Sequence, residues 1–121
     1  MSELFRRALV GGARLFDAGA FFEAHEVWEE RWRIETDAGR RRLLQGLIQI
    51  AAALLKLGAA RDGGAASASR LFARGLAKLD ACPALVAELG LGPFRADMRA
   101  YAHEPTSVRA PIPILTRVEW G

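Results

Sequence analysis

Apolar residues recur at helical spacing through most of the chain. Large apolar side chains return every three or four positions from Leu4 to Phe16 and again from Phe21 to Trp32, which is the pattern of amphipathic helices. Between Leu43 and Leu55 they surround most of a helical circumference, so this segment predicts a central helix that several neighbours cover. The predicted helices span about residues 3–18, 21–33, 38–57, 65–80, 83–89 and 93–101. We therefore expect an all-α fold, an antiparallel bundle of about four to five helices.

Local sequence signals mark where these helices begin and end. Ser2 is a suitable N-cap for the first helix, and Gly19 suits the left-handed conformation that follows a helix end. Thr36 or Asp37 can cap the third helix. The glycine pair 11–12 indicates either a close approach of another backbone or a break in the first helix. The connections are short, so consecutive helices should form antiparallel hairpins.

The length and the last segment define the expected domain organisation. The 121 residues suit one domain, 1–121, with a helical core at about 2–103. An extended arm follows at about 105–121, where three prolines interrupt any helical period. The arm carries six large apolar residues, Val108, Ile112, Ile114, Leu115, Val118 and Trp120. Because these side chains need a surface to cover, we expect self-association as a homodimer. The identity of any protein partner is not predicted.

Composition narrows the protein class. Apolar residues make up 51% and charged residues 26% of the chain, which is typical of a globular protein. No segment is long and apolar enough to predict a membrane span, and no signal peptide is recognisable, so we expect a cytoplasmic protein without a membrane partner. The net charge of +3 comes from scattered arginines without interleaved aromatics, which does not favour nucleic-acid binding. The single cysteine, Cys82, predicts a buried thiol and no disulfide framework.

Residues 21–33, FFEAHEVWEERWR, form the chemically richest segment of the chain. At about 100° per residue, Phe22, His25, Glu29 and Trp32 share one helical face. The adjacent face is apolar, so this helix should be covered on two sides and His25 should lie at the border of the core. Such a position suits either a structural hydrogen-bond network or a functional site.

Hairpin geometry suggests what faces this helix. If the second and third helices turn at residues 35 and 36, positions whose numbers add to about 71 lie level with each other. His25 would then face Gly46, and Glu29 would lie level with Arg42. A glycine inside a helix costs about 1 kcal/mol relative to alanine, so room for a ring from the second helix would explain it. The predicted polar cluster comprises His25, Glu26, Glu29, Gln45 and Gln49, walled by Trp28 and Trp32.

Two segments together resemble a known family. Residues 16–32, FDAGAFFEAHEVWEERW, followed by residues 44–49, LQGLIQ, are similar to the DUF309 family of small all-helical bacterial and archaeal proteins of unknown function. The resemblance extends over roughly residues 15–79. It implies a helical fold and the same polar cluster, but no reaction.

The catalytic and metal motifs in this segment are incomplete. The zinc pattern H-E-x-x-H has Glu29 where it requires histidine, and the di-iron pattern has Phe22 where it requires glutamate. We therefore expect no metal and no cofactor, with His25 and Glu29 as the ligands if a metal is bound. The first interpretation is a structural network, in which His25 pairs with a glutamate on its own helix and a glutamine across the hairpin, or a protein-interaction module.

The alternative to that interpretation is a small-molecule-binding protein or a hydrolase-type enzyme. His25, Glu26 and Glu29 are its candidate catalytic residues, because a carboxylate can orient an imidazole for proton transfer. Its candidate ligand-binding residues are Trp28, Trp32, Gln45 and Gln49. No nucleophile or phosphate-binding loop is recognisable, so the sequence does not identify a reaction.

Overall fold

The computed structural model describes residues 2–58 and 64–103, and within these ranges the chain is helical and has no strand. The helices are α1 (Glu3–Asp17), α2 (Phe21–Ile34), α3 (Ala38–Gly58), α4 (Gly64–Asp80), α5 (Pro83–Glu88) and α6 (Gly92–His103). The all-α prediction is confirmed: the six helices of the described residues match the six predicted ranges, one more than the four to five expected for the bundle. The predicted arm, 105–121, lies outside the described residues.

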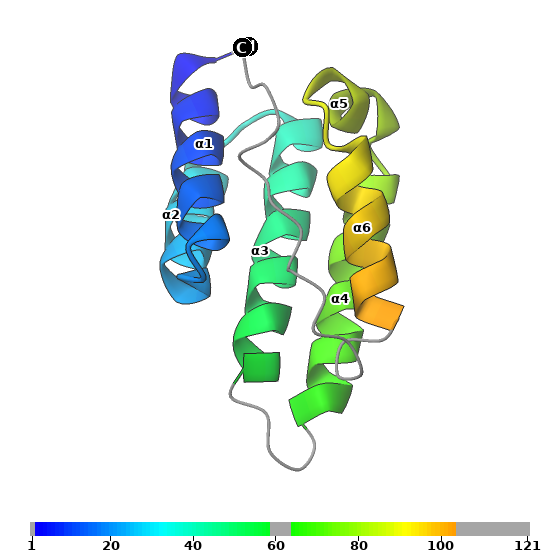
Figure 1. Ribbon diagram of the computed structural model, residues 1–121. Helices are drawn as coiled ribbons and strands as arrows, with labels where there is room; N and C mark the ends of the chain where they lie inside the picture. The colour runs from blue at the N-terminus through cyan, green and yellow to red at the C-terminus, as the bar shows by residue number, and fades with distance from the viewer. Residues whose placement is uncertain (1, 59–63, 104–121) are drawn as a thin grey trace.

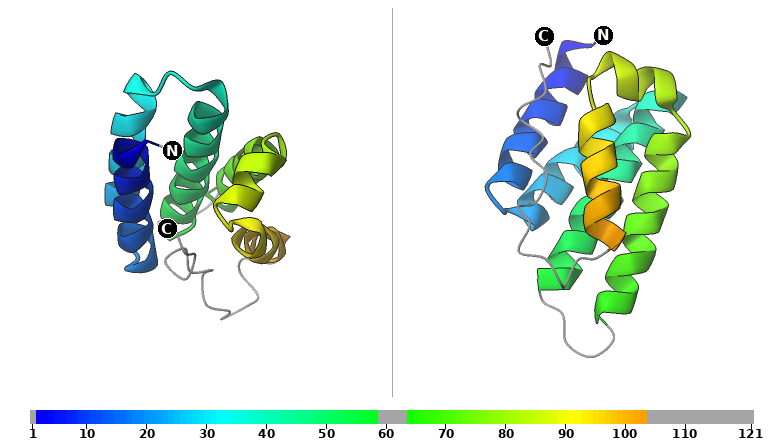
Figure 2. Two further views of the ribbon diagram at one scale, coloured as in Figure 1. Left: turned by 90° about the horizontal axis from the view of Figure 1, so that it is seen from above. Right: turned by 45° about the vertical axis from the view of Figure 1, so that its right-hand side comes forward.

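The long central helix α3 separates two groups of helices. Figure 1 shows α1 and α2 on one side of α3, and α4 with α6 on the other, while α5 lies across the end near the start of α3. The view from above in Figure 2 shows the same order. Helix α3 packs most extensively on α4 and next on α2, and α1 packs on α2. This position explains why α3 is apolar around most of its circumference.

Helix boundaries follow the local signals in the sequence. Ser2 caps α1, since its hydroxyl oxygen accepts a hydrogen bond from the backbone N–H of Phe5 at 3.4 Å. Asp37 caps α3, since its carboxylate accepts from the backbone N–H of Arg40 at 2.9 Å. Gly19 adopts a φ of 81° between α1 and α2, which an L side chain rarely tolerates. The predicted caps and the tight turn are confirmed.

Helix α1 continues through the glycine pair 11–12 without a break. The indole of Trp28 explains why position 12 is glycine. A Cβ atom built on Gly12 would clash with the Trp28 indole, and only glycine leaves that room. The indole N–H donates to the carbonyl oxygen of Leu9 at 3.4 Å, so a fully buried polar group is satisfied. Phe16 lies against Phe21 and Phe94, with ring centroids 5.2 and 5.8 Å apart, which joins α1 to α2 and α6.

The expected position of Gly46 is wrong. Gly46 faces α4, because a Cβ added to it would lie 2.9 Å from the carbonyl oxygen of Gly75. The reverse also holds, since a Cβ on Gly75 would lie 2.7 Å from the carbonyl oxygen of Gly46. The two glycines let α3 and α4 approach backbone to backbone, so Gly46 makes no room for a ring from α2.

The described helices share one apolar core, to which α1 to α6 all contribute. Cys82 is buried as expected, and its thiol donates to the carbonyl oxygen of Lys78 at 3.3 Å. Burial raises the pKa of this thiol, although the charges of Arg42 and Arg95 oppose the change. Among the helices of the described ranges, none combines the length and hydropathy that crossing a membrane requires.

Candidate functional site

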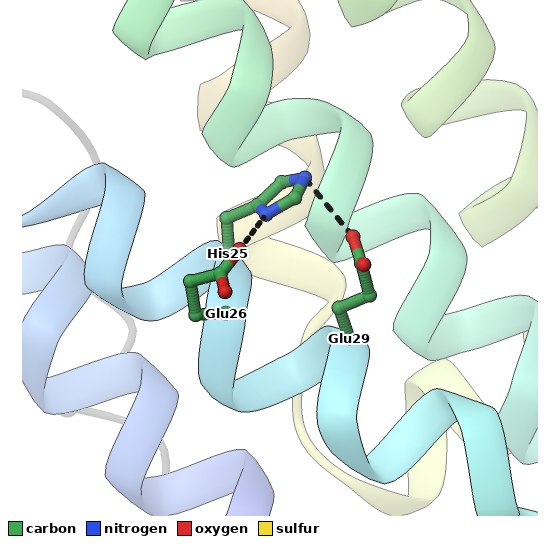
Figure 3. Close-up of side chains that lie close together, drawn as sticks. All are labelled: His25, Glu26 and Glu29. Atoms are coloured by element: carbon green, nitrogen blue, oxygen red, sulfur yellow. Dashed lines mark ion pairs between the residues drawn. The ribbon is translucent and has the colours of Figure 1, made fainter.

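His25, Glu26 and Glu29 form a cluster on α2, here called the His25 cluster. Figure 3 shows the imidazole ring with one carboxylate on each side. The Nδ1 atom of His25 lies 3.4 Å from an oxygen of Glu26, and its Nε2 atom lies 3.5 Å from an oxygen of Glu29. The predicted grouping of these three side chains is therefore observed. The side chains of His25 and Glu29 are 24% and 29% exposed, so the cluster is half-buried and within reach of solvent.

Two buried polar atoms, one on α2 and one on α3, have no hydrogen-bond partner among the described residues. They are Nδ1 of His25, whose contact with Glu26 is not aligned for a hydrogen bond, and Oε1 of Gln49. The side chain of Arg41 donates to the carbonyl oxygen of Trp32 at 2.7 Å, so the start of α3 lies against the end of α2.

The structure corrects the predicted partners of this cluster across the hairpin. No hydrogen bond joins His25 to Gln45 or Gln49, which are both half-buried on α3. Glu29 pairs with Arg33 on its own helix at 2.6 Å instead of Arg42. The charge of Arg42 acts instead on Cys82.

The two tryptophans of α2 hold helices together. Trp28 is fully buried and its indole lies against α1, which leaves it inside the core. Trp32 lies under the guanidinium group of Arg41, which is 4.3 Å from the ring centroid. Neither contact involves the His25 cluster. Trp28 packs α2 on α1, and Trp32 packs α2 on α3.

A second polar group lies at the other end of α2, here called the Glu35 network: Arg31, Glu35, Asp37 and Arg41. Glu35 is 4% exposed, yet its carboxylate accepts two hydrogen bonds from Arg31, at 2.9 and 3.3 Å, and one from the backbone N–H of Asp37 at 3.0 Å. Burial alone would raise the pKa of Glu35. The Asp37 hydrogen bond, the hydrogen bond and charge of Arg31, and the charge of Arg40 outweigh it and lower the pKa.

Sequence reasoning missed the Glu35 network as a unit. The available signal was the i, i+4 spacing of Arg31 and Glu35, followed at once by the helix-capping Asp37. The sequence does not show that Glu35 is buried, and this burial turns a surface pair into a structural one.

The donor atoms of the His25 cluster suit a divalent cation. Its three side chains offer ligand atoms that all lie within 4.8 Å of one another. With metal–ligand bonds near 2.1 Å, neighbouring ligand atoms lie about 3.0 Å apart in octahedral and about 3.4 Å apart in tetrahedral coordination. The separation of 3.5 Å between His25 Nε2 and the Glu29 oxygen is close to the tetrahedral value. Residues four apart on a helix can therefore chelate one ion here.

The family comparison covers about half of the chain. A sequence model of DUF309, described as a domain of unknown function, matches residues 9–68. The matched range contains the whole of α2 and α3, and so includes both the His25 cluster and the Glu35 network. No curated protein matches the chain significantly.

Proposed function

This chain belongs to the DUF309 family, whose function is unknown, and we propose that it is a small metal-binding domain in which His25 and Glu29 hold one divalent cation. The observation that carries the proposal is the pair of ligand atoms from consecutive turns of α2, His25 Nε2 and a Glu29 oxygen, 3.5 Å apart in a half-buried position. Both side chains already point toward each other, so binding requires little rearrangement.

The expected structural network is present in part, and the proposal goes beyond it. His25 lies beside Glu26 and Glu29 of its own helix, whereas no hydrogen bond joins it to a glutamine of α3. Buried polar groups in folded proteins usually have partners, and an unpaired one costs about 1 to 3 kcal/mol. The unpaired Nδ1 atom shows that the imidazole of His25 is not held by a closed hydrogen-bond network among the described residues.

The donor set indicates the class of ion. Imidazole nitrogen suits first-row transition metals such as Zn²⁺, and a carboxylate oxygen is an accepted second ligand for them. Ca²⁺ is disfavoured, because it requires six to eight oxygen ligands. Water or a small anionic ligand would fill the remaining coordination positions, so the site would stay open on its solvent side.

Calorimetric titration of the full chain with Zn²⁺ tests the proposal. We expect about one ion per chain, and a large loss of affinity in both His25→Ala and Glu29→Gln. Two controls should bind like the wild type. Glu23→Gln changes an exposed glutamate of the same helix, and His103→Ala removes the second histidine of the chain. Absence of zinc binding in the wild type, or equal binding in all variants, would contradict the metal site and favour a structural role for the cluster.

Self-association is a separate proposal and rests on the sequence of the arm alone. Its six large apolar residues and its prolines favour packing on a second copy of the chain. Light scattering of a chain truncated before Val108 should show a smaller mass than the full chain. The same number of chains per particle in both proteins would contradict this proposal.

A further inference from the structure

We infer that Glu26 is a positioning residue, which holds the proton of His25 on Nδ1 and so presents the bare Nε2 atom to the cation. The inference rests on the proposed metal site and assigns Glu26 a role in it. A neutral imidazole carries one N–H and one bare nitrogen, and only the bare nitrogen can bind a metal. Each ring nitrogen of His25 lies beside a carboxylate, so the other surroundings of the two nitrogens decide which one carries the proton.

The surroundings of the two nitrogens differ. Nδ1 is buried, which leaves no room beside it for a hydrated ion. Its carboxylate neighbour Glu26 is the next residue in the chain, about 100° around the helix. Nε2 instead faces Glu29, one turn further along the same helical face. Nε2 has no hydrogen bond within the described part of the chain either but is not enclosed in this way, so the side of Nε2 and Glu29 is the one that a cation can reach.

The carboxylates are also held differently. Glu29 is half-buried, and one of its oxygens accepts from Arg33 at 2.6 Å, which fixes the group while its second oxygen faces His25. Glu26 is 54% exposed and has no arginine or lysine partner among the described residues, so it is free to turn. A small rotation of Glu26 would align its oxygen, now 3.4 Å from Nδ1, to accept an N–H from that atom.

This arrangement is the one that metal-bound histidines usually show. The ring nitrogen that does not bind the metal donates its N–H to a carboxylate, which sets the tautomer and the orientation of the ring. Loss of such a partner typically lowers metal affinity by about 10- to 100-fold. Glu26 would thus act through His25, without contacting the ion itself.

The tautomer of His25 can be measured without any metal. We propose long-range ¹H–¹⁵N spectra of the metal-free full chain at pH 8, above the usual titration range of imidazole. The wild type should show a protonated Nδ1 and a bare Nε2. Glu26→Ala should lose this preference, whereas Glu26→Gln should keep most of it, because its amide oxygen still accepts a hydrogen bond. The matched control, Glu30→Ala, removes another exposed glutamate of α2 and should behave like the wild type.

Zinc titration of the same proteins completes the test. Glu26→Ala should bind Zn²⁺ about 10- to 100-fold more weakly than the wild type, with Glu26→Gln and Glu30→Ala close to the wild type. A wild-type proton on Nε2, or an unchanged tautomer and affinity in Glu26→Ala, would overturn the role of Glu26. If the wild type binds no zinc, the metal site itself is wrong, and the metal-free spectra still decide whether Glu26 holds the Nδ1 proton.

Discussion

The two ends of α2 both carry carboxylates next to a basic side chain, but only one of the two groups has its hydrogen bonds formed. In the Glu35 network, a carboxylate that is 4% exposed receives three hydrogen bonds from Arg31 and Asp37. In the His25 cluster, side chains that are 24% to 54% exposed lie 3.4 to 3.5 Å apart without an aligned hydrogen bond between the ring and either carboxylate. The more buried group is satisfied, and the more accessible one is not.

This difference separates a structural role from a binding role. A buried carboxylate is tolerated when its hydrogen bonds and charge are fully matched, so the Glu35 network fixes the turn between α2 and α3. The His25 cluster leaves the buried Nδ1 atom without a hydrogen-bond partner among the described residues, although the side chains of His25 and Glu29 are partly exposed. Retaining such atoms lowers stability, which a folded protein tolerates mainly where function requires it. The two groups should therefore respond oppositely to substitution.

The largest expected effect is the loss of Glu35. Replacement by alanine leaves the Arg31 side chain, which is only 15% exposed, and the Asp37 N–H without their acceptor. We expect the free energy of unfolding to fall by roughly 2 to 3 kcal/mol. Urea denaturation measures this, with the exposed Glu30→Ala on the same helix as the control. Similar unfolding midpoints for the two variants would contradict a structural role for Glu35.

A smaller loss is expected from Arg41→Ala. The guanidinium group donates to the carbonyl oxygens of Trp32 and Glu35, at 2.7 and 3.4 Å, and stacks on the Trp32 ring. Losing these contacts should lower stability by about 1 to 2 kcal/mol. Arg42→Ala removes an exposed neighbouring charge and should change little. If Arg42→Ala lowers stability as much as Arg41→Ala, the loss comes from removing a positive charge and not from losing the contacts of Arg41.

The unpaired oxygen of Gln49 predicts a substitution that does not lower stability. Gln49→Leu removes a buried oxygen that has no partner and keeps a side chain of similar size. The free energy of unfolding should stay equal or rise by up to about 1 kcal/mol, and more so than in Gln45→Leu. A decrease of more than about 1 kcal/mol in chemical denaturation would show that Gln49 belongs to a structural network after all.

The smallest effect concerns pH. The pKa of Glu35 is lowered by folding from its ordinary value of 4.5, so its charged form stabilises the folded state. That contribution is fully present above pH 4.5 and is lost as the pH falls through the folded pKa. The stability difference between wild type and Glu35→Gln should therefore narrow on acidification from about pH 6 to about pH 3. A constant difference would mean that the charge of Glu35 is unimportant.

The sequence predicts much of the fold because the relevant signals are local. Ser2, Gly19 and Asp37 act within a turn of their own positions, so the helix boundaries they mark are found in the structure. The grouping of His25 with Glu29 is also local, since residues four apart on a helix are neighbours.

Contacts between helices were harder to predict. Helix α3 is apolar around most of its circumference, so its pattern does not show which side faces α2 and which faces α4. The face of Gly46 was accordingly assigned to α2, whereas it meets Gly75 on α4. The predicted partners of His25 and Glu29 across the hairpin were also wrong, because Glu29 pairs with Arg33 and His25 lies beside Glu26 and Glu29, all on α2 itself.

Thermal denaturation of three proteins with and without Zn²⁺ tests the contrast between the two ends of α2 most directly. Without metal, Glu35→Gln should melt below the wild type, and Glu29→Gln should melt close to it, since its exposed pair with Arg33 contributes little. Zinc at about 100 times its dissociation constant should stabilise the wild type and Glu35→Gln by about 2.7 kcal/mol and leave Glu29→Gln unchanged. An equal zinc response in all three proteins, or none in any of them, would contradict the assignment of the His25 cluster as a metal site.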